Sequence, residues 1–117
     1  MNPPSYHRED VASWANYQQA GYVIGGTAWG FANPSIRSLG LDLVVVDEAG
    51  QFALANTITA VSCARCALLL GDPQQLPQVS QGSHPEPVNE SSLHHLLQGS
   101  KTMPTDMGYF LETTYRL

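Results

Sequence analysis

The chain has 117 residues, of which 43% are hydrophobic and only 13% charged, and this composition fits one globular domain rather than a disordered segment. Its net charge of −5 argues against strong nucleic-acid binding by this chain alone, because such affinity comes mainly from neutralising phosphates. No apolar run approaches the roughly 20 residues of a membrane span, and the N-terminus lacks the apolar stretch of a signal peptide. We therefore expect a cytoplasmic (intracellular) protein that has no membrane partner.

The first third of the sequence predicts a helix and then a short strand. Residues 8–20 carry apolar side chains at helical spacing, and Gly21 is the expected C-cap of that helix. Tyr22-Val23-Ile24 is expected to start a short strand that runs into Gly25-Gly26-Thr27. Asn33-Pro34 should interrupt the regular structure beyond this strand, because proline lacks a backbone donor.

Two apolar segments dominate the middle of the chain. Residues 41–47 are nearly all apolar and rich in β-branched side chains, as expected of a strand buried on both faces. A second buried strand is expected at residues 67–70, and residues 51–62 between them predict a helix. The side chains that recur along that helix are Phe52, Ala55, Ile58 and Val61. The strand–helix–strand alternation indicates parallel strands joined by a crossover helix.

The last third predicts loops around one short helix. Residues 77–90 are polar and rich in proline, which favours a loop. A short helix is expected near residues 91–98, begun by Ser91 or Ser92, and residues 99–108 are expected to form a second loop.

An acidic pair, Asp47-Glu48, comes directly after the first apolar strand. Open α/β sheets bind ligands at the carboxyl ends of their strands. Two carboxylates there can divide the work, one holding a magnesium ion through water and the other deprotonating an attacking water. The alternative is a solvated turn in which Glu48 lies near a helix N-terminus, where a negative charge is favourable. These residues alone leave both interpretations open.

Two further polar groups have candidate chemistry. Asp72 and Gln75 come after the second apolar strand, so they should converge on the same edge of the sheet, where they are suited to sensing a phosphate. A polar turn made by glycine and proline is the alternative. Tyr115-Arg116 places an aromatic ring beside a guanidinium, a pair that can stack a base and neutralise phosphate, although such pairs are more often surface packing.

Together these segments resemble the superfamily 1 helicases, most closely the branch whose Walker B motif reads Asp-Glu-Ala-x-Gln. That motif is Asp47-Glu48-Ala49-Gly50-Gln51 here. The family's third motif resembles Gly71-Asp72-Pro73-Gln74-Gln75-Leu76-Pro77, and its fourth resembles Tyr115-Arg116. Gly25-Gly26-Thr27 is similar to the motif whose threonine touches single-stranded nucleic acid. The resemblance runs from about Gly21 to the last residue.

The resemblance implies an α/β fold, a three-layer RecA-like parallel sheet of the P-loop NTPase type. Residues 1–20 would be an N-terminal lead and helix, and residues 21–117 the C-terminal part of the first RecA-like domain, from a motif Ic-like to a motif IV-like segment. That sheet is expected to be incomplete, because no stretch of the chain reads Gly-x-x-x-x-Gly-Lys-Ser/Thr. The Walker A strand and loop and the second RecA-like domain are expected to lie outside this chain, which would then be one piece of a motor.

The resemblance also implies roles at an ATP site, with ATP as the substrate and Mg²⁺ as the cofactor. Asp47 would coordinate Mg²⁺ through water, and Glu48 would be the general base toward the water that attacks the γ-phosphate. Gln51 and Gln75 would sense the γ-phosphate and couple it to the nucleic-acid groove. Asp72 would belong to the same nucleotide-binding surface.

Four more residues receive roles from the resemblance. Tyr115 would stack on adenine, and Arg116 would act as an arginine finger. Thr27 would contact the backbone of single-stranded nucleic acid. Trp29 would stack a base there, and a core or hinge aromatic is the alternative reading for it.

The intact parent is therefore expected to hydrolyse ATP while it translocates on and unwinds DNA or RNA, and this chain alone is expected to be inactive. One alternative is a non-catalytic, helicase-derived interaction or regulatory module, which the missing phosphate loop favours. Another is a different P-loop ATPase family that carries a Gly-Asp-x-x-Gln loop. Cys63 and Cys66 have zinc-site spacing, but the chain offers no second cysteine pair, so two buried structural thiols are expected.

Overall fold

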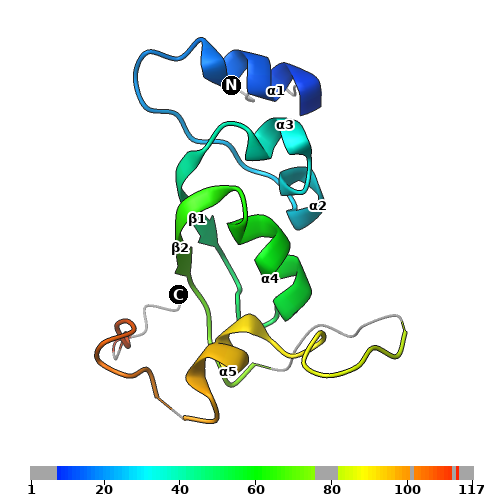
Figure 1. Cartoon of the computed structure of the whole chain (residues 1–117). Coiled ribbons are helices and arrows are strands. Elements are labelled where there is room, and N and C mark those ends of the chain that lie inside the picture. Colours follow the sequence, from blue (N-terminus) through cyan, green and yellow to red (C-terminus); the bar gives the residue numbers. More distant parts are fainter. Residues whose placement is uncertain (1–7, 76–81, 101, 112, 114–117) are drawn as a thin grey trace.

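The computed structural model describes residues 8–75, 82–100, 102–111 and 113. Figure 1 shows α1 and α3 at one end of the molecule and α5 at the other, with the two strands and α4 between them. No helix in the described ranges is long and apolar enough to cross a membrane. The elements in chain order are α1 (Arg8–Asn16), α2 (Ala28–Phe31), α3 (Pro34–Arg37), β1 (Leu41–Val46), α4 (Leu54–Val61), β2 (Ala64–Leu69) and α5 (Ser92–Leu97).

The sheet consists of β1 and β2, which pair in parallel. Its register runs from Leu41 opposite Ala64 to Val46 opposite Leu69. Helix α4 connects the two strands and packs against both, so the predicted strand–helix–strand unit is confirmed. The second strand begins at Ala64, earlier than the apolar run at residues 67–70 suggested.

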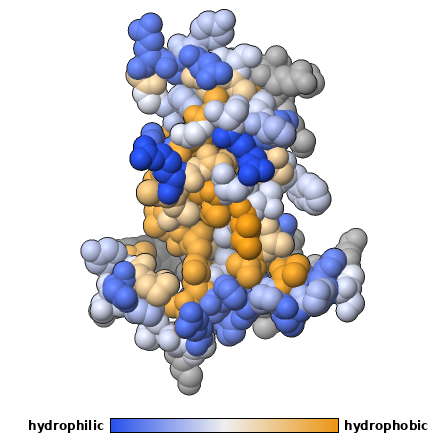
Figure 2. Space-filling view, viewed as in Figure 1, coloured by the Kyte–Doolittle hydropathy of each residue, from blue (hydrophilic) through white to orange (hydrophobic). Residues whose placement is uncertain are grey.

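Only one face of the sheet is buried. Val44 and Val46 are buried on the side of the core, whereas Leu43 and Val45 keep 52% and 51% of their surface exposed. On β2, Leu68 shares that open face with Val45, its partner in the register. The prediction that the strand at residues 41–47 is buried on both faces is therefore wrong, because α4 packs against only one face of the sheet within the described ranges. Figure 2 shows apolar residues as a band in the middle of the molecule.

Helix α1 ends earlier than expected, and the strand predicted next is not formed. The helix stops at Asn16 rather than near Gly21, because the backbone turns at once and the Gln18 side chain donates to the Trp14 carbonyl at 3.1 Å. Tyr22-Val23-Ile24 belongs to no helix and pairs with no strand in the described part of the chain. A groove of 500 Å³ lies between this segment and β1, and its walls include residues of both.

The predicted break at Asn33-Pro34 is confirmed, because α2 ends before it and α3 begins at Pro34. The Asn33 side chain accepts a hydrogen bond from the Ser35 amide at 3.0 Å, and Pro34 occupies the first helical turn, where no amide donor is needed.

Helices α4 and α5 confirm the two helices predicted in the second half of the chain. The apolar stripe proposed for residues 51–62 is confirmed in part, because Phe52 and Val61 pack against the core. It is wrong at Ile58, which is 57% exposed, while Thr57 and Ala60 are buried instead. Ser91 is the N-cap of α5, and its hydroxyl accepts a hydrogen bond from the His94 amide at 3.1 Å. The core at the start of α5 contains Val46, Ala49 and Leu93, with Phe52, Val61 and Leu69 packed around them.

Candidate functional site

The acidic pair lies in a turn that leaves β1 at Val46. One carboxylate oxygen of Asp47 accepts a hydrogen bond from the Glu48 amide at 2.9 Å. Glu48 has a φ of 55°, in the left-handed region that side chains other than glycine rarely adopt. Both carboxylates are exposed. The alternative that places Glu48 at a helix N-terminus is wrong, because α4 begins only at Leu54.

The loop after β2 closes against this turn, as the sequence predicted. The Ala49 amide donates to the Leu70 carbonyl at 2.8 Å. Glycine is required at position 50 because a Cβ there would collide with the carbonyl oxygen of Asp72. Asp72 in turn orders its own loop, since its side chain accepts from the Gln74 amide at 2.9 Å. The two polar loops therefore meet at one edge of the sheet.

Two glutamines join these loops through their side chains. The Nε2 of Gln51 donates to the Oε1 of Gln75 at 2.9 Å. Gln51 belongs to the turn after β1 and Gln75 to the loop after β2, so the bond spans 24 residues of sequence. A displacement of either side-chain amide would therefore affect the position of the other.

Helix α5 is tied to the acidic turn, a contact that sequence reasoning missed. The Ser92 hydroxyl donates to the Ala49 carbonyl at 3.0 Å, and the Ser92 amide donates to the Phe52 carbonyl at 3.0 Å. The Glu90 carbonyl accepts from the Leu54 amide at 2.8 Å, which also places the start of α4. The signal for this contact is the Ala49 carbonyl, which needs a hydrogen-bond partner inside the fold. A sequence does not reveal which carbonyls lack a partner.

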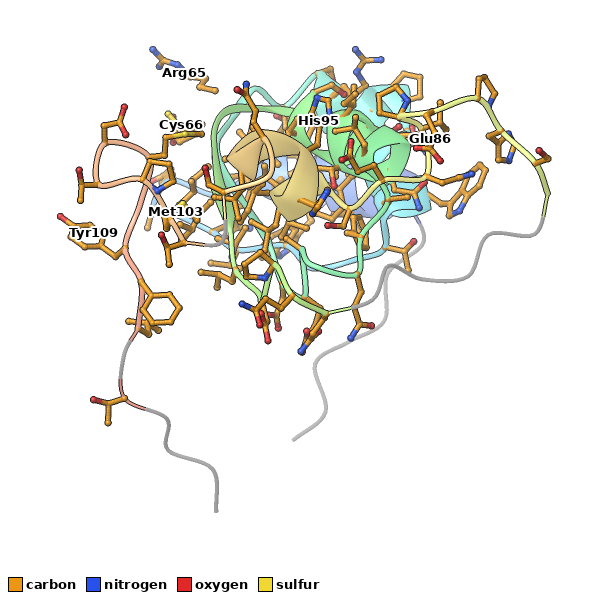
Figure 3. The ribbon with its side chains drawn as sticks, turned by 90° about the horizontal axis from the view of Figure 1, so that it is seen from below. Arg65, Cys66, Glu86, His95, Met103 and Tyr109 are labelled. Atoms are coloured by element: carbon orange, nitrogen blue, oxygen red, sulfur yellow. The ribbon has the colours of Figure 1, made fainter. Side chains whose placement is uncertain are left out.

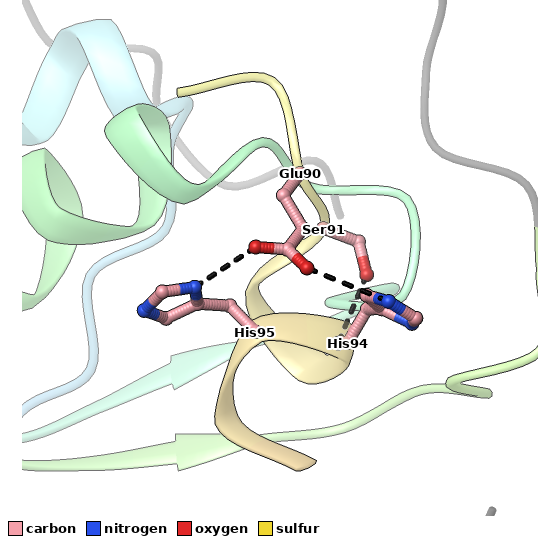
Figure 4. Close-up of polar contacts among 4 residues, drawn as sticks. All are labelled: Glu90, Ser91, His94 and His95. Carbon is pink, nitrogen blue, oxygen red and sulfur yellow. Dashed lines mark hydrogen bonds and ion pairs between the residues drawn. The ribbon is translucent and has the colours of Figure 1, made fainter. Parts of the chain in front are cut away.

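A carboxylate with two imidazoles lies at the start of α5 (Figure 4). The Nδ1 of His95 lies 2.9 Å from one oxygen of Glu90, and the Nε2 of His94 lies 3.4 Å from the other. The two rings therefore share one carboxylate, that of Glu90, at the first turn of α5.

Asp47 has the donor chemistry that Mg²⁺ prefers. One of its oxygens is engaged by the Glu48 amide, and the other makes no hydrogen bond within the described ranges. Mg²⁺ in nucleotide sites takes one or two carboxylates and completes its shell with water and phosphate oxygens. An exposed carboxylate with one oxygen to spare fits such a role. Among the described residues, no group of three or more His, Cys, Asp or Glu side chains is arranged to hold a metal ion by itself.

The residues predicted to touch nucleic acid lie at α2. The Thr27 hydroxyl accepts a hydrogen bond from the Gly30 amide at 3.3 Å, so Thr27 is the N-cap of this helix. Trp29 is 77% exposed, so the reading of it as a core aromatic is wrong. A pocket of 220 Å³ opens beside them, with Gly26 and Phe31 in its wall. Tyr115-Arg116 lies outside the described residues.

The two cysteines differ sharply in exposure. Cys63 is buried, its thiol donates to the Ala60 carbonyl at 2.8 Å, and burial raises the pKa of that thiol. Cys66 is exposed, so the expectation of two buried thiols holds for Cys63 and is wrong for Cys66. Figure 3 shows Cys66 beside Arg65, on the side of the molecule away from Glu86.

Carboxylates at the end of a parallel strand, closed by a polar loop from the neighbouring strand, lie at the edge where open α/β sheets generally bind ligands. The chain belongs to the family described as an AAA domain, which matches residues 11–81. It is 30% identical over 96 residues to the 5'-3' DNA helicase ZGRF1 of Mus musculus, an alignment that covers 80% of this chain. It is 34% identical over 61 residues to the DNA replication ATP-dependent helicase/nuclease JHS1 of Arabidopsis thaliana, which covers 52% of this chain.

The chain spans 5% of the length of each of these relatives. No solved structure matches it. The family and the two helicase relatives confirm the resemblance to superfamily 1 helicases, which the motifs from Gly21 onward had indicated.

Proposed function

We propose that this chain supplies part of the ATPase site of a superfamily 1 helicase, which hydrolyses ATP to translocate on and unwind DNA or RNA. The observation that carries the proposal is the meeting of two polar loops at one sheet edge, joined by the 2.9 Å bond between Gln51 and Gln75. The similarity to a DNA helicase and to an ATP-dependent helicase/nuclease supports it.

The acidic turn takes the central role in this proposal. Asp47 would hold Mg²⁺ through water, and the ion would supply positive charge against the phosphates. Glu48 accepts the proton of the attacking water, which is the part of a general base. The left-handed backbone at Glu48 supports this assignment, because rare backbone conformations persist where neighbouring contacts enforce them and often mark functional sites.

The amide pair links nucleotide state to the rest of the motor. In the proposal Gln51 and Gln75 sense the γ-phosphate, and their mutual hydrogen bond lets both respond when that phosphate is lost. Asp72 keeps the second loop in place through its bond to the Gln74 amide. Thr27 and Trp29 lie on the nucleic-acid side, where the exposed indole of Trp29 is free to stack on a base.

The rest of the proposed site comes from the last residues of this chain and from segments outside it. Tyr115 stacks on adenine and Arg116 stabilises the transferring phosphate, as the resemblance implies. Residues 21–117 form the C-terminal part of the first RecA-like domain of a three-layer sheet. The longer protein contributes the Walker A segment and the second RecA-like domain. Because the phosphate loop supplies most of the triphosphate contacts, the 117-residue chain alone does not hydrolyse ATP.

The test compares carboxylate variants in the full-length protein that carries this chain. Glu48→Gln should keep binding of ATP with Mg²⁺ but lower kcat by about 10²–10⁴-fold, because an amide cannot take the proton. Asp47→Asn should weaken the Mg²⁺-dependent binding as well. Arg116→Ala should lower kcat by roughly 10³–10⁵-fold with little effect on ground-state binding.

Asp42→Asn is the matched control, because Asp42 is an exposed carboxylate on the same strand, at the end away from the turn. It should leave both binding and kcat unchanged. Near-normal turnover of Glu48→Gln would overturn the assignment, and a non-catalytic, helicase-derived interaction module would then be the better description.

A further inference from the structure

Ser92 is almost completely buried, with 1% of its surface exposed. Its hydroxyl donates to the Ala49 carbonyl at 3.0 Å across 43 residues of sequence, and Ala49 itself is completely buried. A buried carbonyl needs a hydrogen-bond partner, and this hydroxyl provides it. The contact therefore reaches from α5 into the turn that carries Asp47 and Glu48.

Ala49 is held on both sides of its Cα atom. Its amide donates to the Leu70 carbonyl at 2.8 Å, which fixes the peptide plane between Glu48 and Ala49. Its carbonyl accepts from Ser92, which fixes the next peptide plane, between Ala49 and Gly50. The backbone just beyond Glu48 is therefore held by Leu70, the residue after β2, on one side and by α5 on the other.

This double hold adds to two local bonds of 2.9 Å at Glu48, in which its amide donates to Asp47 and its carbonyl accepts from the Gln51 amide. A φ of 55° is unfavourable for a glutamate, so neighbouring contacts must enforce it. Two such contacts reach the turn immediately after Glu48, and the one from Ser92 comes from a side chain. Without that hydroxyl, the Ala49–Gly50 peptide would lose its anchor and Glu48 could relax toward an ordinary conformation.

We propose that Ser92 is a positioning residue, which holds the Ala49 peptide so that the Glu48 carboxylate keeps its place for catalysis. The catalytic part of this inference rests on the proposed function of Glu48. Ser92 does not touch the nucleotide in this assignment. It acts through the backbone of the turn, so its loss should affect kcat rather than the binding of ATP.

Ser91 provides a matched control one residue away. It is also buried, at 3% exposed, and its hydroxyl also makes one hydrogen bond, but to the His94 amide within α5. Ser91→Ala therefore removes a helix cap, whereas Ser92→Ala removes the link to the acidic turn. A purely structural role would make the two variants alike.

The first experiment measures kcat and KM for ATP in the full-length protein. Ser92→Ala should lower kcat about 10- to 100-fold, the scale expected for a small displacement of a catalytic group, and leave KM within about twofold. Ser91→Ala should lower the melting temperature and leave kcat unchanged. Equal kcat values for Ser92→Ala and the parent, or equal losses in both variants, would overturn the proposal.

The second experiment needs no catalysis, so it separates this inference from the proposed function. Amide hydrogen exchange in the 117-residue chain should accelerate at Gly50 and Gln51 in Ser92→Ala and not in Ser91→Ala. If exchange changes in this way but Glu48→Gln in the full-length protein keeps its turnover, Ser92 does hold the turn and Glu48 is not the general base. Unchanged exchange in Ser92→Ala would show that the Ser92 hydroxyl does not hold the turn.

Ser92→Cys covers the case in which Ser92→Ala does not fold, because a thiol keeps a similar size and is a weaker donor. Its kcat should fall below that of the parent at an unchanged KM. A Ser92→Cys protein with the kcat of the parent would refute the positioning role.

Discussion

The acidic turn after β1 and the segment around α2 differ in where their hydrogen-bond partners come from. Ala49 is held by Leu70 on one side and Ser92 on the other, both distant in sequence. Thr27, in contrast, bonds to Gly30 only three residues away. The proposed hydrolytic residues therefore depend on the assembled fold, whereas the proposed nucleic-acid residues depend on local structure. A catalytic group needs a fixed position. A surface that binds a flexible nucleic-acid strand benefits from being able to move independently of the rest of the fold.

The largest expected effect is at Gly50, where the two polar loops touch. Gly50→Ala should lower the free energy of unfolding by about 3 kcal/mol, because the new methyl meets the Asp72 carbonyl oxygen and one backbone must move. Chemical denaturation of the chain measures this loss. Gly30→Ala is the control, since a Cβ there has only the Thr27 hydroxyl at 3.8 Å and alanine favours the helix. Equal stability of the two variants would contradict the close approach of the loops.

A smaller effect is expected at the cap of α2. Thr27→Ala should cost about 1 kcal/mol, the usual loss when a side-chain N-cap is removed. Thr27→Ser keeps the hydroxyl and should recover most of that loss. Amide exchange should rise at Gly30 and stay unchanged in the acidic turn, because the bond is local. Faster exchange at Ala49 would show that the two regions are coupled after all.

The bond between the two glutamines should contribute less still. Gln51→Ala and Gln75→Ala, combined in a double-mutant cycle, should give a coupling free energy of about 0.5 kcal/mol, since Gln51 is exposed and water replaces its partner. Urea unfolding of the four proteins supplies the values. A cycle that closes at zero would show that the pair makes no net contribution in solution.

The smallest change is expected at Trp29. Trp29→Ala should alter the free energy of unfolding by less than about 0.5 kcal/mol, because its side chain is 77% exposed. Trp14→Ala should cost more, since the Trp14 ring packs edge-on against Tyr22 with centroids 5.9 Å apart. Acrylamide should quench Trp29 more strongly than Trp14. Similar quenching of both indoles would contradict the exposure of α2.

The sequence predicted the features whose causes are local. The apolar run before Asp47 and its repeat before Gly71 identify both strands, and the helix between them makes the strands parallel. This topology alone brings the Asp47-Glu48 turn close to the loop of Asp72. The cap at Ser91 was likewise visible as a side chain suited to begin a helix, whereas Asn33 was predicted only to interrupt the regular structure.

The features that sequence reasoning missed depend on distant partners. Tyr22-Val23-Ile24 has strand propensity, but a strand also needs a neighbour within hydrogen-bond reach, and the groove beside β1 separates them. Apolar content alone could not show that Leu43 and Val45 face outward, because burial depends on what covers the sheet. The bond from Ser92 to Ala49 joins parts of the chain that no local pattern connects. The roles assigned to Asp47 and Glu48 stay predictions.

The exposed sulfur of Cys66 makes the open face of the sheet accessible to a spectroscopic label. Cys66 lies opposite Leu43 in the register, whereas Cys63 is buried with a raised pKa and should react slowly near neutral pH. A maleimide dye should therefore attach to one defined position without mutagenesis. Its emission would shift to the blue whenever another segment or molecule covers Leu43 and its neighbours, so the natural sequence already contains an attachment point for monitoring that event in real time.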